Sequence, residues 1–288
     1  MFCFIEANRQ VIPVSVMCER FKVSRSGFYA WQGRGPSARS IDDTRLGELI
    51  QHAHAAGRGF YGSPRVTWHL RRSGVLVGRG RVARLMRQAG LQGHGSGLFR
   101  SRLPLLKFFA KVPNRIRELD VRAQDRLWHG DVTYLKVAGA WRYFAVVMDR
   151  FSRRIVGWSL STQRTATLTI DALRHAIRHR KPAQGLHFHS DRGIEYAALD
   201  FKAKLRQHGF IQSMNRPASM NDNAHMESFF HSLKVEGLYK KTFACDQQLS
   251  EALVDYIQFY NQQRLHSSIG YLPPAAFERG NLTPTGVH

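Results

Sequence analysis

Cysteine is scarce in this chain of 288 residues, which contains only Cys3, Cys18 and Cys245, far apart and without a C-x-x-C pair. Such scattered thiols argue against a disulfide framework and against a cysteine zinc site. No apolar run approaches the ~18 residues of a membrane-spanning helix, and the opening MFCFIEANRQ lacks the charged and apolar segments of a signal peptide. We therefore expect a protein of the reducing cytoplasm with no membrane partner.

Acidic residues are also few: 21 Asp and Glu stand against 43 Lys and Arg, which gives a formal net charge of +22 at pH 7. The excess is spread over the whole chain, so it does not come from a basic tail. Lysine and arginine side chains placed at phosphates release condensed counterions, and a polyanionic partner is the natural interpretation. A basic protein of the ribosomal or chromatin type is the alternative that charge alone leaves open.

The first third of the chain has the pattern of small helical modules. Residues 1–35 contain two short helical stretches separated by a Ser-containing turn, and they predict a helix-turn-helix segment. Residues 33–43, GRGPSARSIDD, are expected to be a linker. Residues 40–95 predict a second helical DNA-binding module, whose polar faces carry seven arginines that could meet phosphates: Arg65, Arg71, Arg72, Arg79, Arg81, Arg84 and Arg87. A solvated basic face on an ordinary bundle is the alternative. Residues 96–126 are expected to be a basic connector.

From residue 127 the pattern changes to strands rich in aromatic and β-branched residues. Residues 128–137, 141–149 and 154–160 predict an antiparallel meander, followed by a helix over 166–179, a short strand at 186–190, a helix over 199–209, a strand at 210–214 and a helix from 225. This order, β-β-β-α-β-α-β-α, indicates an α/β domain with a mixed sheet flanked by helices over 127–240. Residues 241–288 are expected to extend it with further helix.

Three acidic residues stand out within this pattern. Asp131 lies inside the apolar first strand, where a charged residue is disfavoured. Asp191 directly follows the fourth strand, at the edge where open α/β sheets bind ligands. Glu227 lies early in the last core helix, which Asn221, Asp222 or Asn223 could cap. Taken singly, each acid has an ordinary explanation as an edge charge, a turn former or a solvated helix residue.

Taken together, the three carboxylates point to a metal site. If the first and fourth strands are neighbours, Asp131 and Asp191 meet and the helix carrying Glu227 can close the site. Converging carboxylates repel one another unless a cation neutralises them. Magnesium prefers such oxygen ligands together with phosphate oxygens, and two ions can promote an in-line displacement at phosphorus.

The motifs WHGDVTY (128–134), HSDRG (189–193) and DNAHMESFF (222–230), followed by Lys234, resemble those of the DDE transposases of the insertion-sequence-three group. Thirty-five residues separate Asp191 from Glu227, the interval that names the signature of that family. The resemblance implies a ribonuclease-H-like core similar to retroviral integrase. It departs from the family pattern at Ala218, where a glycine is usual, and at Glu195, where a glutamine is common.

The resemblance extends over nearly the whole chain. CERFKVSRSGFYAW (18–31) is similar to the family's helix-turn-helix, and the stretch from YGSPR (61–65) to RLMRQAG (84–90) is similar to its second helical module. It implies that Lys234 acts near the DNA end, with a solvated lysine as the alternative. YNQQRLH (260–266) and GYLPP (270–274) resemble the closing motif, which makes Arg264 and His266 candidate DNA or active-site supports. A helix C-terminus whose basic residues face its own carbonyls explains those two equally well.

We therefore expect a polynucleotidyl transferase that binds terminal inverted repeats, cuts to leave a 3′ hydroxyl and joins it to a second phosphodiester. Its cofactor is expected to be two Mg²⁺ ions, with Mn²⁺ as a substitute. Its expected partners are double-stranded DNA and further copies of itself on DNA. The resemblance also implies the first-frame product of a two-frame element, fused or separate, as a partner on which multimerisation depends, since no sustained heptad repeat occurs here. The resemblance places it at the bacterial nucleoid. An inactive DNA-binding regulator and a ribonuclease-H-type nuclease are the alternatives.

Overall fold

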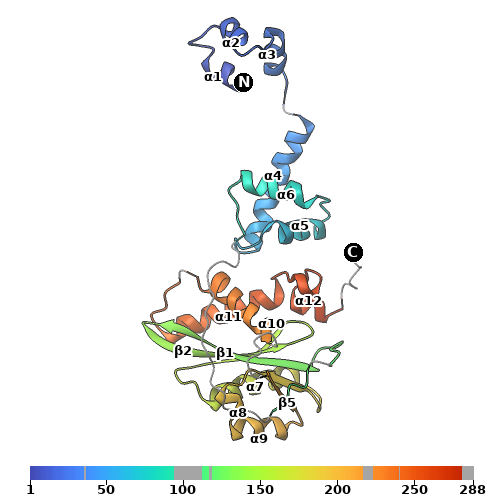
Figure 1. The fold of residues 1–288 in the computed structure, drawn as a ribbon, viewed down its shortest axis with the longest axis vertical. Coiled ribbons are helices and arrows are strands. Elements are labelled where there is room, and N and C mark those ends of the chain that lie inside the picture. The colour runs from blue at the N-terminus through green and yellow to red at the C-terminus, as the bar shows by residue number, and fades with distance from the viewer. Residues whose placement is uncertain (36, 94–111, 117–118, 217–222, 240, 281–288) are drawn as a thin grey trace.

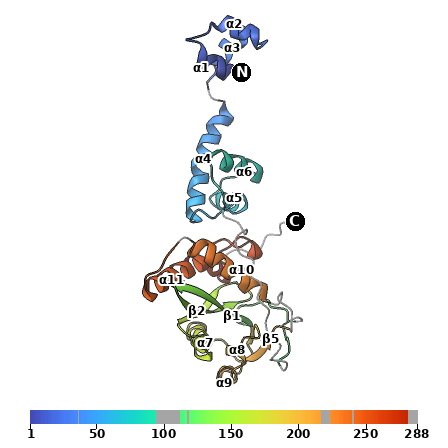
Figure 2. The same ribbon diagram turned by 60° about the vertical axis from the view of Figure 1, so that its left-hand side comes forward.

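The structure is a computed structural model, and it describes residues 1–35, 37–93, 112–116, 119–216, 223–239 and 241–280. Figures 1 and 2 show a small helical module at the N-terminus, a second helical module, and a larger core in which helices cover both faces of a sheet. Within the described residues, none of the helices combines the length and the hydropathy needed to span a bilayer.

The N-terminal module consists of three short helices that share one small core. The helices are α1 (Phe2–Asn8), α2 (Val14–Arg20) and α3 (Arg25–Gln32). Ser24 caps α3, because its side chain accepts a hydrogen bond from the backbone N–H of Gly27 at 3.0 Å. Ile5, Cys18 and Phe28 are buried between the helices. The helix-turn-helix pair expected from the sequence is confirmed, and α1 is an additional helix that the sequence pattern did not indicate.

The second module consists of α4 (Ala38–Ala56), α5 (Ser63–Arg72) and α6 (Arg79–Gln88). Helix α4 begins inside the stretch 33–43, so the expectation of a linker through Asp43 is wrong. Ser37 accepts a hydrogen bond from the backbone N–H of Ser40 and starts the helix there. The apolar core of this module also includes Leu265. Residues from the far end of the chain therefore pack against the second module.

The core contains one five-stranded sheet in the order β3-β2-β1-β4-β5. Strands β1, β2 and β3 form the expected antiparallel meander, and β4 and β5 continue it in parallel to β1. The strands are β1 (Leu127–Val137), β2 (Ala140–Asp149), β3 (Ile155–Ser161), β4 (His187–Ser190) and β5 (Ile211–Met214). The mixed sheet expected from the sequence is thus confirmed, and β1 and β4 are neighbours.

Helices cover both faces of this sheet (Figures 1 and 2). One face carries α7 (Ala166–Arg180), α8 (Ile194–Ala197) and α9 (Leu199–Gln207), and the other carries α10 (Ala224–Ser232) and α11 (Asp246–Gln262). A Cβ atom at Gly157 would lie 2.3 Å from the carbonyl oxygen of Ala172, so the absence of a side chain lets β3 approach α7 closely. The short helix α8 had no signal in the sequence pattern.

Three shorter segments complete the core. They are a π-helical turn, η2 (Leu233–Gly237), a 3₁₀ turn, η3 (Ser267–Ile269), and α12 (Pro274–Glu278). The continuous helix expected after residue 225 therefore ends at Ser232. Of the expected connector 96–126, residues 112–116 and 119–126 contain no helix or strand, and most of the remainder lies outside the described residues.

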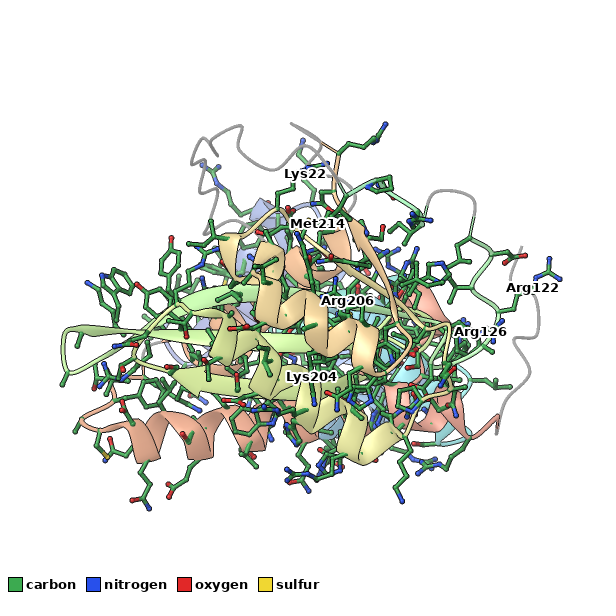
Figure 3. All side chains as sticks on the ribbon, turned by 90° about the horizontal axis from the view of Figure 1, so that it is seen from below. Lys22, Arg122, Arg126, Lys204, Arg206 and Met214 are labelled. Atoms are coloured by element: carbon green, nitrogen blue, oxygen red, sulfur yellow. The ribbon has the colours of Figure 1, made fainter. Side chains whose placement is uncertain are left out.

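Basic side chains are spread over the core as well as over the helical modules. Figure 3, a view along the long axis from the end that carries the core, labels Arg122 and Arg126 before β1 and Lys204 and Arg206 on α9. Positive charge thus reaches the part of the molecule that contains the sheet. This distribution agrees with the sequence-based expectation that the excess charge belongs to the whole chain.

Helix α12 is tied to the sheet by a buried ion-pair network. The carboxylate of Glu278 accepts hydrogen bonds from Ser152 at 2.8 Å, Arg154 at 2.5 Å and Arg180 at 2.9 Å. Arg180 in turn donates to Asp125 at 2.9 Å. Burial alone would raise the pKa of Glu278, but the hydrogen bonds from Arg180 and Arg154 outweigh it and lower that pKa.

We expect Glu278→Gln to lower the free energy of unfolding at pH 7 by about 3 kcal/mol, because the half-buried Arg154 loses this carboxylate and the more deeply buried Arg180 keeps only Asp125. A carboxyl whose folded pKa is lowered stabilises the fold above its unfolded pKa, and this contribution is lost as the pH falls through the folded value. The difference between wild type and variant should therefore be complete above about pH 4.3 and shrink below it.

Urea unfolding of both proteins at several pH values measures this difference. The control is Asp171→Asn, which removes an exposed i,i+3 pair with Arg174 and should change stability by less than about 1 kcal/mol. A Glu278→Gln effect that stays constant down to pH 3 would contradict the assignment.

Candidate active site

Asp131 and Asp191 lie side by side because their strands are parallel neighbours. The register pairs Gly130 of β1 with Ser190 of β4, and each aspartate is the next residue along its chain. An Asp131 carboxylate oxygen accepts the backbone N–H of Val132 at 2.7 Å, and one from Asp191 accepts that of Gly193 at 3.0 Å. The sheet topology thus brings together two residues that lie sixty positions apart in the sequence.

The part of the core next to the two aspartates is aromatic and tightly packed. A Cβ atom at Gly130 would lie 2.6 Å from the ring of Phe188 and 3.2 Å from that of Tyr196, so glycine is required where β1 passes these rings. Both rings are buried in the core on the α7 side of the sheet. This packing holds the backbone on the N-terminal side of Asp131 and excludes water from below.

The site accumulates negative charge that the fold does not neutralise fully. Burial raises the pKa of Asp131 well above its ordinary value, and the charges of Asp191 and Glu227 raise it further. Burial also raises the pKa of Asp191, with a further contribution from Glu195, while Arg164 acts in the opposite direction. Like charges held this close favour a cation between them.

Glu227 lies on α10, and its charge acts on Asp131, but it does not complete a ligand shell in this structure. Its side chain is exposed. Among the described residues, no group of three His, Cys, Asp or Glu side chains is close enough to hold a metal ion. Asn223 precedes α10, but its side chain does not cap the helix; its Oδ1 lies 3.0 Å from Nδ1 of the buried His129. Asn221 and Asp222 lie outside the described residues.

The donor set fits magnesium better than zinc. The acids supply only oxygen atoms, which hard divalent cations prefer. The nearest imidazoles are those of His129 and His189, whose rings lie 5.1 Å apart. Burial lowers the pKa of His129 well below its ordinary value, with His189 adding to the effect, so His129 is neutral. A hydrogen-bonding distance of 2.6 Å joins Nε2 of His189 to Asn215.

A fourth carboxylate near the site, Glu195 on α8, was noted in the sequence only as a departure from the family pattern. Its side chain is fully buried, and its Oε1 accepts two hydrogen bonds from Arg164, at 3.0 and 2.8 Å. Its Oε2 is buried without a hydrogen-bond partner. No sequence pattern indicated this pair, because Arg164 lies before α7 and meets Glu195 only through the tertiary fold.

Lys234 lies near the acids, but in a different type of helix from the one expected. The helix expected from residue 225 would include Lys234, whereas Lys234 lies in the π-helical turn η2. Its ammonium group lies 5.0 Å from the centre of the Tyr134 ring. Burial lowers the pKa of Lys234, and the charge of Asp131 opposes that shift. Lys234 is therefore near enough to Asp131 to sense its charge.

Arg264 and His266, which the sequence offered as DNA or active-site supports, lie inside the protein and not on a surface open to DNA. Both are buried, with 5% and 7% of their surface exposed. Arg264 donates two hydrogen bonds of 2.6 Å to Glu236 and one of 3.0 Å to Ser232. The ring of His266 packs against that of Tyr260 with centroids 4.5 Å apart. These contacts join η2 to the end of α11 inside the protein.

The same region carries the contact between the second module and the core. The hydroxyl of Tyr61 accepts the backbone N–H of Leu265 at 3.0 Å, and Arg58 pairs with Asp255 at 2.6 Å. The half-buried Arg65 lies 3.9 Å from Glu236 and above the Tyr61 ring. Arg65 therefore belongs to the junction between the module and the core, where internal contacts already engage it.

Three other arginines of the second module differ in whether an internal ion pair engages their side chains. Arg84 and Arg81 both pair with Asp43, at 2.6 and 2.7 Å, so their charge is partly balanced within the protein. Arg87 is exposed at the end of α6. Arg65 and Arg84 are half-buried, whereas Arg87 is exposed, as are Arg71, Arg72 and Arg79 of the same module.

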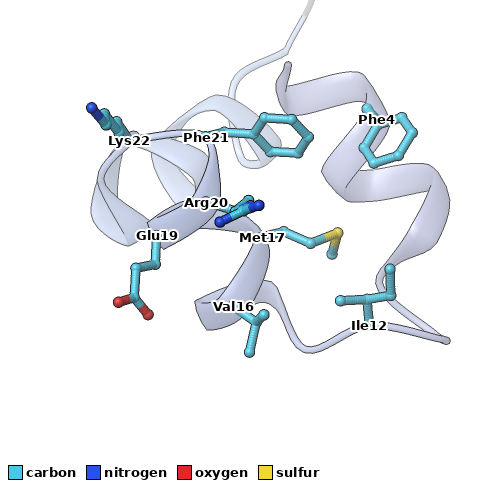
Figure 4. Close-up of a pocket in the computed structure, with 8 residues that line it drawn as sticks. All are labelled: Phe4, Ile12, Val16, Met17, Glu19, Arg20, Phe21 and Lys22. Atoms are coloured by element: carbon cyan, nitrogen blue, oxygen red, sulfur yellow. The ribbon is translucent and has the colours of Figure 1, made fainter.

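A separate hollow of about 620 Å³ lies in the N-terminal module, far from the acids along the molecule (Figures 1 and 4). Apolar side chains line it together with the charged residues of α2 and the turn after it. The residues are Phe4, Ile12, Val16, Met17, Glu19, Arg20, Phe21 and Lys22. It contains no cluster of nucleophilic or metal-binding groups and takes no part in the chemistry of the carboxylates.

Comparison with known families matches three parts of the chain. The integrase core domain family matches residues 121–220, and a second integrase core domain family matches residues 227–282. The HTH-like domain family matches residues 40–94. The integrase matches cover the sheet and the helix that carries Glu227, and the HTH-like match covers α4 to α6.

Curated relatives match over almost the whole length. Transposase InsF for insertion sequence IS3A of Escherichia coli is 35% identical over 98% of this chain and 99% of its own length. An uncharacterized 31 kDa protein of insertion element IS600 from Shigella sonnei is 37% identical over 91% of this chain and 97% of its own. A simian T-cell lymphotropic virus intasome chain has 18% identity and a TM-score of 0.49 over 80% of this chain and 74% of its own, too weak a likeness to add to this. The chain therefore belongs to the IS3 family of transposases and carries an integrase catalytic core.

Proposed function

We propose that this chain cuts and joins DNA at the ends of its insertion sequence, with Asp131, Asp191 and Glu227 as the catalytic acids. The observation that carries the proposal is the pairing of β1 with β4. It places two aspartates side by side in a buried setting that raises the pKa of both. Burying adjacent carboxylates is costly, so a site of this kind is maintained for the cation it binds.

Magnesium held by these three carboxylates would supply Lewis-acid stabilisation of the phosphorane charge, and two ions fit the family's chemistry, with manganese as a substitute. Asp131 and Asp191 would hold the ion where β1 and β4 pair in the sheet. The exposed Glu227 has to move toward them on α10 to complete the set. Lys234 carries a positive charge close to Asp131, where it can pair with a phosphate oxygen beside the scissile bond.

The reaction has two displacements at phosphorus. In the first, water adds to the phosphodiester at the element end, and the bond to the 3′ oxygen breaks as that oxygen takes up a proton. In the second, this 3′ hydroxyl attacks a phosphodiester of the target, giving up its proton, and a new 3′ hydroxyl leaves. No covalent intermediate with the protein is needed, which fits a site formed from carboxylates.

Double-stranded DNA is the proposed partner of the helical modules. Arg71, Arg72, Arg79 and Arg87 are exposed on the second module and are available to neutralise phosphates. We infer that Arg87 binds DNA directly, while Arg84 and Arg65 act through the internal contacts described above. Assembly of several copies on DNA, with or without a first-frame product, belongs to the same proposal.

Incubation of the chain with a plasmid that carries its gene and native flanking DNA tests the proposal. We expect nicks at the element ends with Mg²⁺ or Mn²⁺ and none with EDTA, because the carboxylates cannot position the phosphate without a cation. Gel shift in EDTA measures binding separately. An inactive regulator would shift the DNA without cutting it, and a ribonuclease-H-type enzyme would cut an RNA–DNA hybrid in place of the plasmid.

A further inference from the structure

Near the turn end of the β1–β2 hairpin, two exposed aromatic rings lie between the exposed Lys136 and the half-buried Lys234 of η2. We refer to these four residues, Lys234, Tyr134, Trp141 and Lys136, as the aromatic–lysine strip. Tyr134 and Trp141 are 43% and 48% exposed, and their rings are in contact, so they form one exposed aromatic patch. Neither ring was singled out in the sequence as a functional residue.

The contacts within the strip are continuous. Lys234 lies 5.0 Å from the centre of the Tyr134 ring, and that ring meets Trp141 edge to face at 5.0 Å. Lys136 lies 4.8 Å from the centre of the Trp141 ring. Within the described part of the chain, neither lysine pairs with a carboxylate, so both charges remain available to an anion.

The fold exposes this strip because the hairpin outruns its neighbours. Strand β1 pairs with β4 only through Gly130, so from Asp131 onward that edge of β1 has no strand beside it. Leu135 and Val137 face the core on the α10 side, while Tyr134 and Lys136 face the other way. In Figure 1 the turn end of the hairpin lies at one margin of the sheet, beyond α7, α8 and α9.

The strip begins beside the catalytic acids. Tyr134 follows Asp131 by three residues, about 10 Å along an extended strand. The two side chains project from opposite faces of β1, and Lys234 connects them. It comes from the α10 side, contacts the Tyr134 ring and senses the charge of Asp131. A DNA strand leaving the acids can therefore pass the free edge of β1 and reach the rings.

We propose that the aromatic–lysine strip binds unpaired nucleotides of the DNA next to the scissile phosphate, with bases stacked on Tyr134 and Trp141 and phosphates near Lys136 and Lys234. Exposed aromatic rings with cations beside them have the chemistry with which proteins bind single-stranded nucleic acid: bases stack on the rings and phosphates lie near the cations. A duplex keeps its bases inside and cannot offer them to these rings. This inference rests on the proposed function and specifies the form of its substrate: an element end whose strands are separated locally.

The test compares two labelled probes by fluorescence anisotropy, using the full chain in EDTA so that no cleavage occurs. One probe is a short oligothymidylate, and the other is an abasic phosphodiester of the same length and charge. Wild type is expected to bind the oligothymidylate at least about fivefold more tightly, the lower end of what one stacked base contributes. Equal affinities for the two probes would overturn the proposal.

Variants separate stacking from a merely structural role of the rings. Tyr134→Leu and Trp141→Leu should each remove most of the preference for bases, while Tyr134→Phe and Trp141→Phe should keep it. Lys136→Gln should weaken both probes alike and reduce the salt dependence of binding. Leucine variants that keep the wild-type preference would show that the rings only stabilise the hairpin, and the proposal would fall.

The matched control is Tyr29→Leu, which removes a ring that is 51% exposed in the N-terminal module and should leave the preference unchanged. Asp131→Asn should lose cleavage and keep the base preference, which separates this inference from the proposed function. If wild type never cuts DNA but shows the base preference, the strip binds DNA and the transferase assignment fails. If DNA is cut and the preference is absent, the transferase assignment stands and the strip has no such part.

Discussion

Single replacement of Asp131, Asp191 or Glu227 by the corresponding amide is expected to reduce strand cleavage and joining at least about a thousandfold. Each carboxylate helps to place a cation that is worth several kcal/mol of transition-state stabilisation, and each ~1.4 kcal/mol corresponds to a factor of ten in rate. Binding of element-end DNA in EDTA should be almost unchanged, since these acids contribute no positive charge. The measurement is product formation on end-labelled DNA, with a gel shift on the same protein.

Stability measurements exclude loss of folding as the cause. Burial and Asp191 raise the pKa of Asp131, which means that the ionised carboxylate disfavours the folded state at neutral pH. Asp131→Asn removes this penalty, so its melting temperature at pH 7 should equal or exceed that of wild type. Asp200→Asn, on the exposed side of α9, is a matched control that should keep full activity. Joining that persists in all three amide variants would refute the assignment of the acids.

Arg264→Met is expected to lower the free energy of unfolding by about 3 to 5 kcal/mol, because it leaves the buried carboxylate of Glu236 with only the longer contact to Arg65 at 3.9 Å and the hydroxyl of Tyr256. In the native protein Glu236 receives two hydrogen bonds of 2.6 Å from Arg264, and both side chains are almost fully buried. The double change Arg264→Met with Glu236→Met should recover part of the loss, since the poorly paired carboxylate is then absent and only the more exposed Arg65 loses its contact with Glu236. Chemical unfolding of the three variants measures these differences.

The matched control for Arg264 is Arg87→Met, which removes an exposed arginine of α6. This change should leave the unfolding free energy almost unaltered, weaken DNA binding for all sequences, and reduce the salt slope by about one. If Arg264→Met behaves in that way and keeps wild-type stability, Arg264 contacts DNA and its placement in an internal network is wrong.

Local patterns along the chain were sufficient for the elements of the core. The alternation in β1 and β2 and the helical spacing in α7 and α9 predicted these elements with bounds close to those observed. The pattern failed where the signal is short or the helix type changes. Helix α8 spans only Ile194–Ala197, and η2 differs from α10 in hydrogen-bond pattern and not in composition.

The residues of the candidate site also fall into two groups: those that a local sequence pattern identified, and those whose role only the tertiary contacts revealed. Asp131 and Asp191 could be identified because a charged residue in or directly after an apolar strand is conspicuous in the sequence. The sequence left the role of Arg264 open, because an arginine close to a histidine at a helix end has the same local pattern whether it faces DNA or a buried glutamate. Glu236 lies twenty-eight residues earlier and meets Arg264 only in the folded protein.

The amino-acid sequence by itself determined the charge, the mixed sheet and its flanking helices, and which three acids stand out, because burial period and residue type act over a few neighbouring positions. The tertiary structure alone decided that Glu195 joins Arg164, that Arg264 and His266 are internal, and that Tyr134 and Trp141 form an exposed strip beside the acids. These relations depend on which segments lie together after folding, and on the length by which one strand outruns another, and neither quantity is encoded in any short stretch of chain.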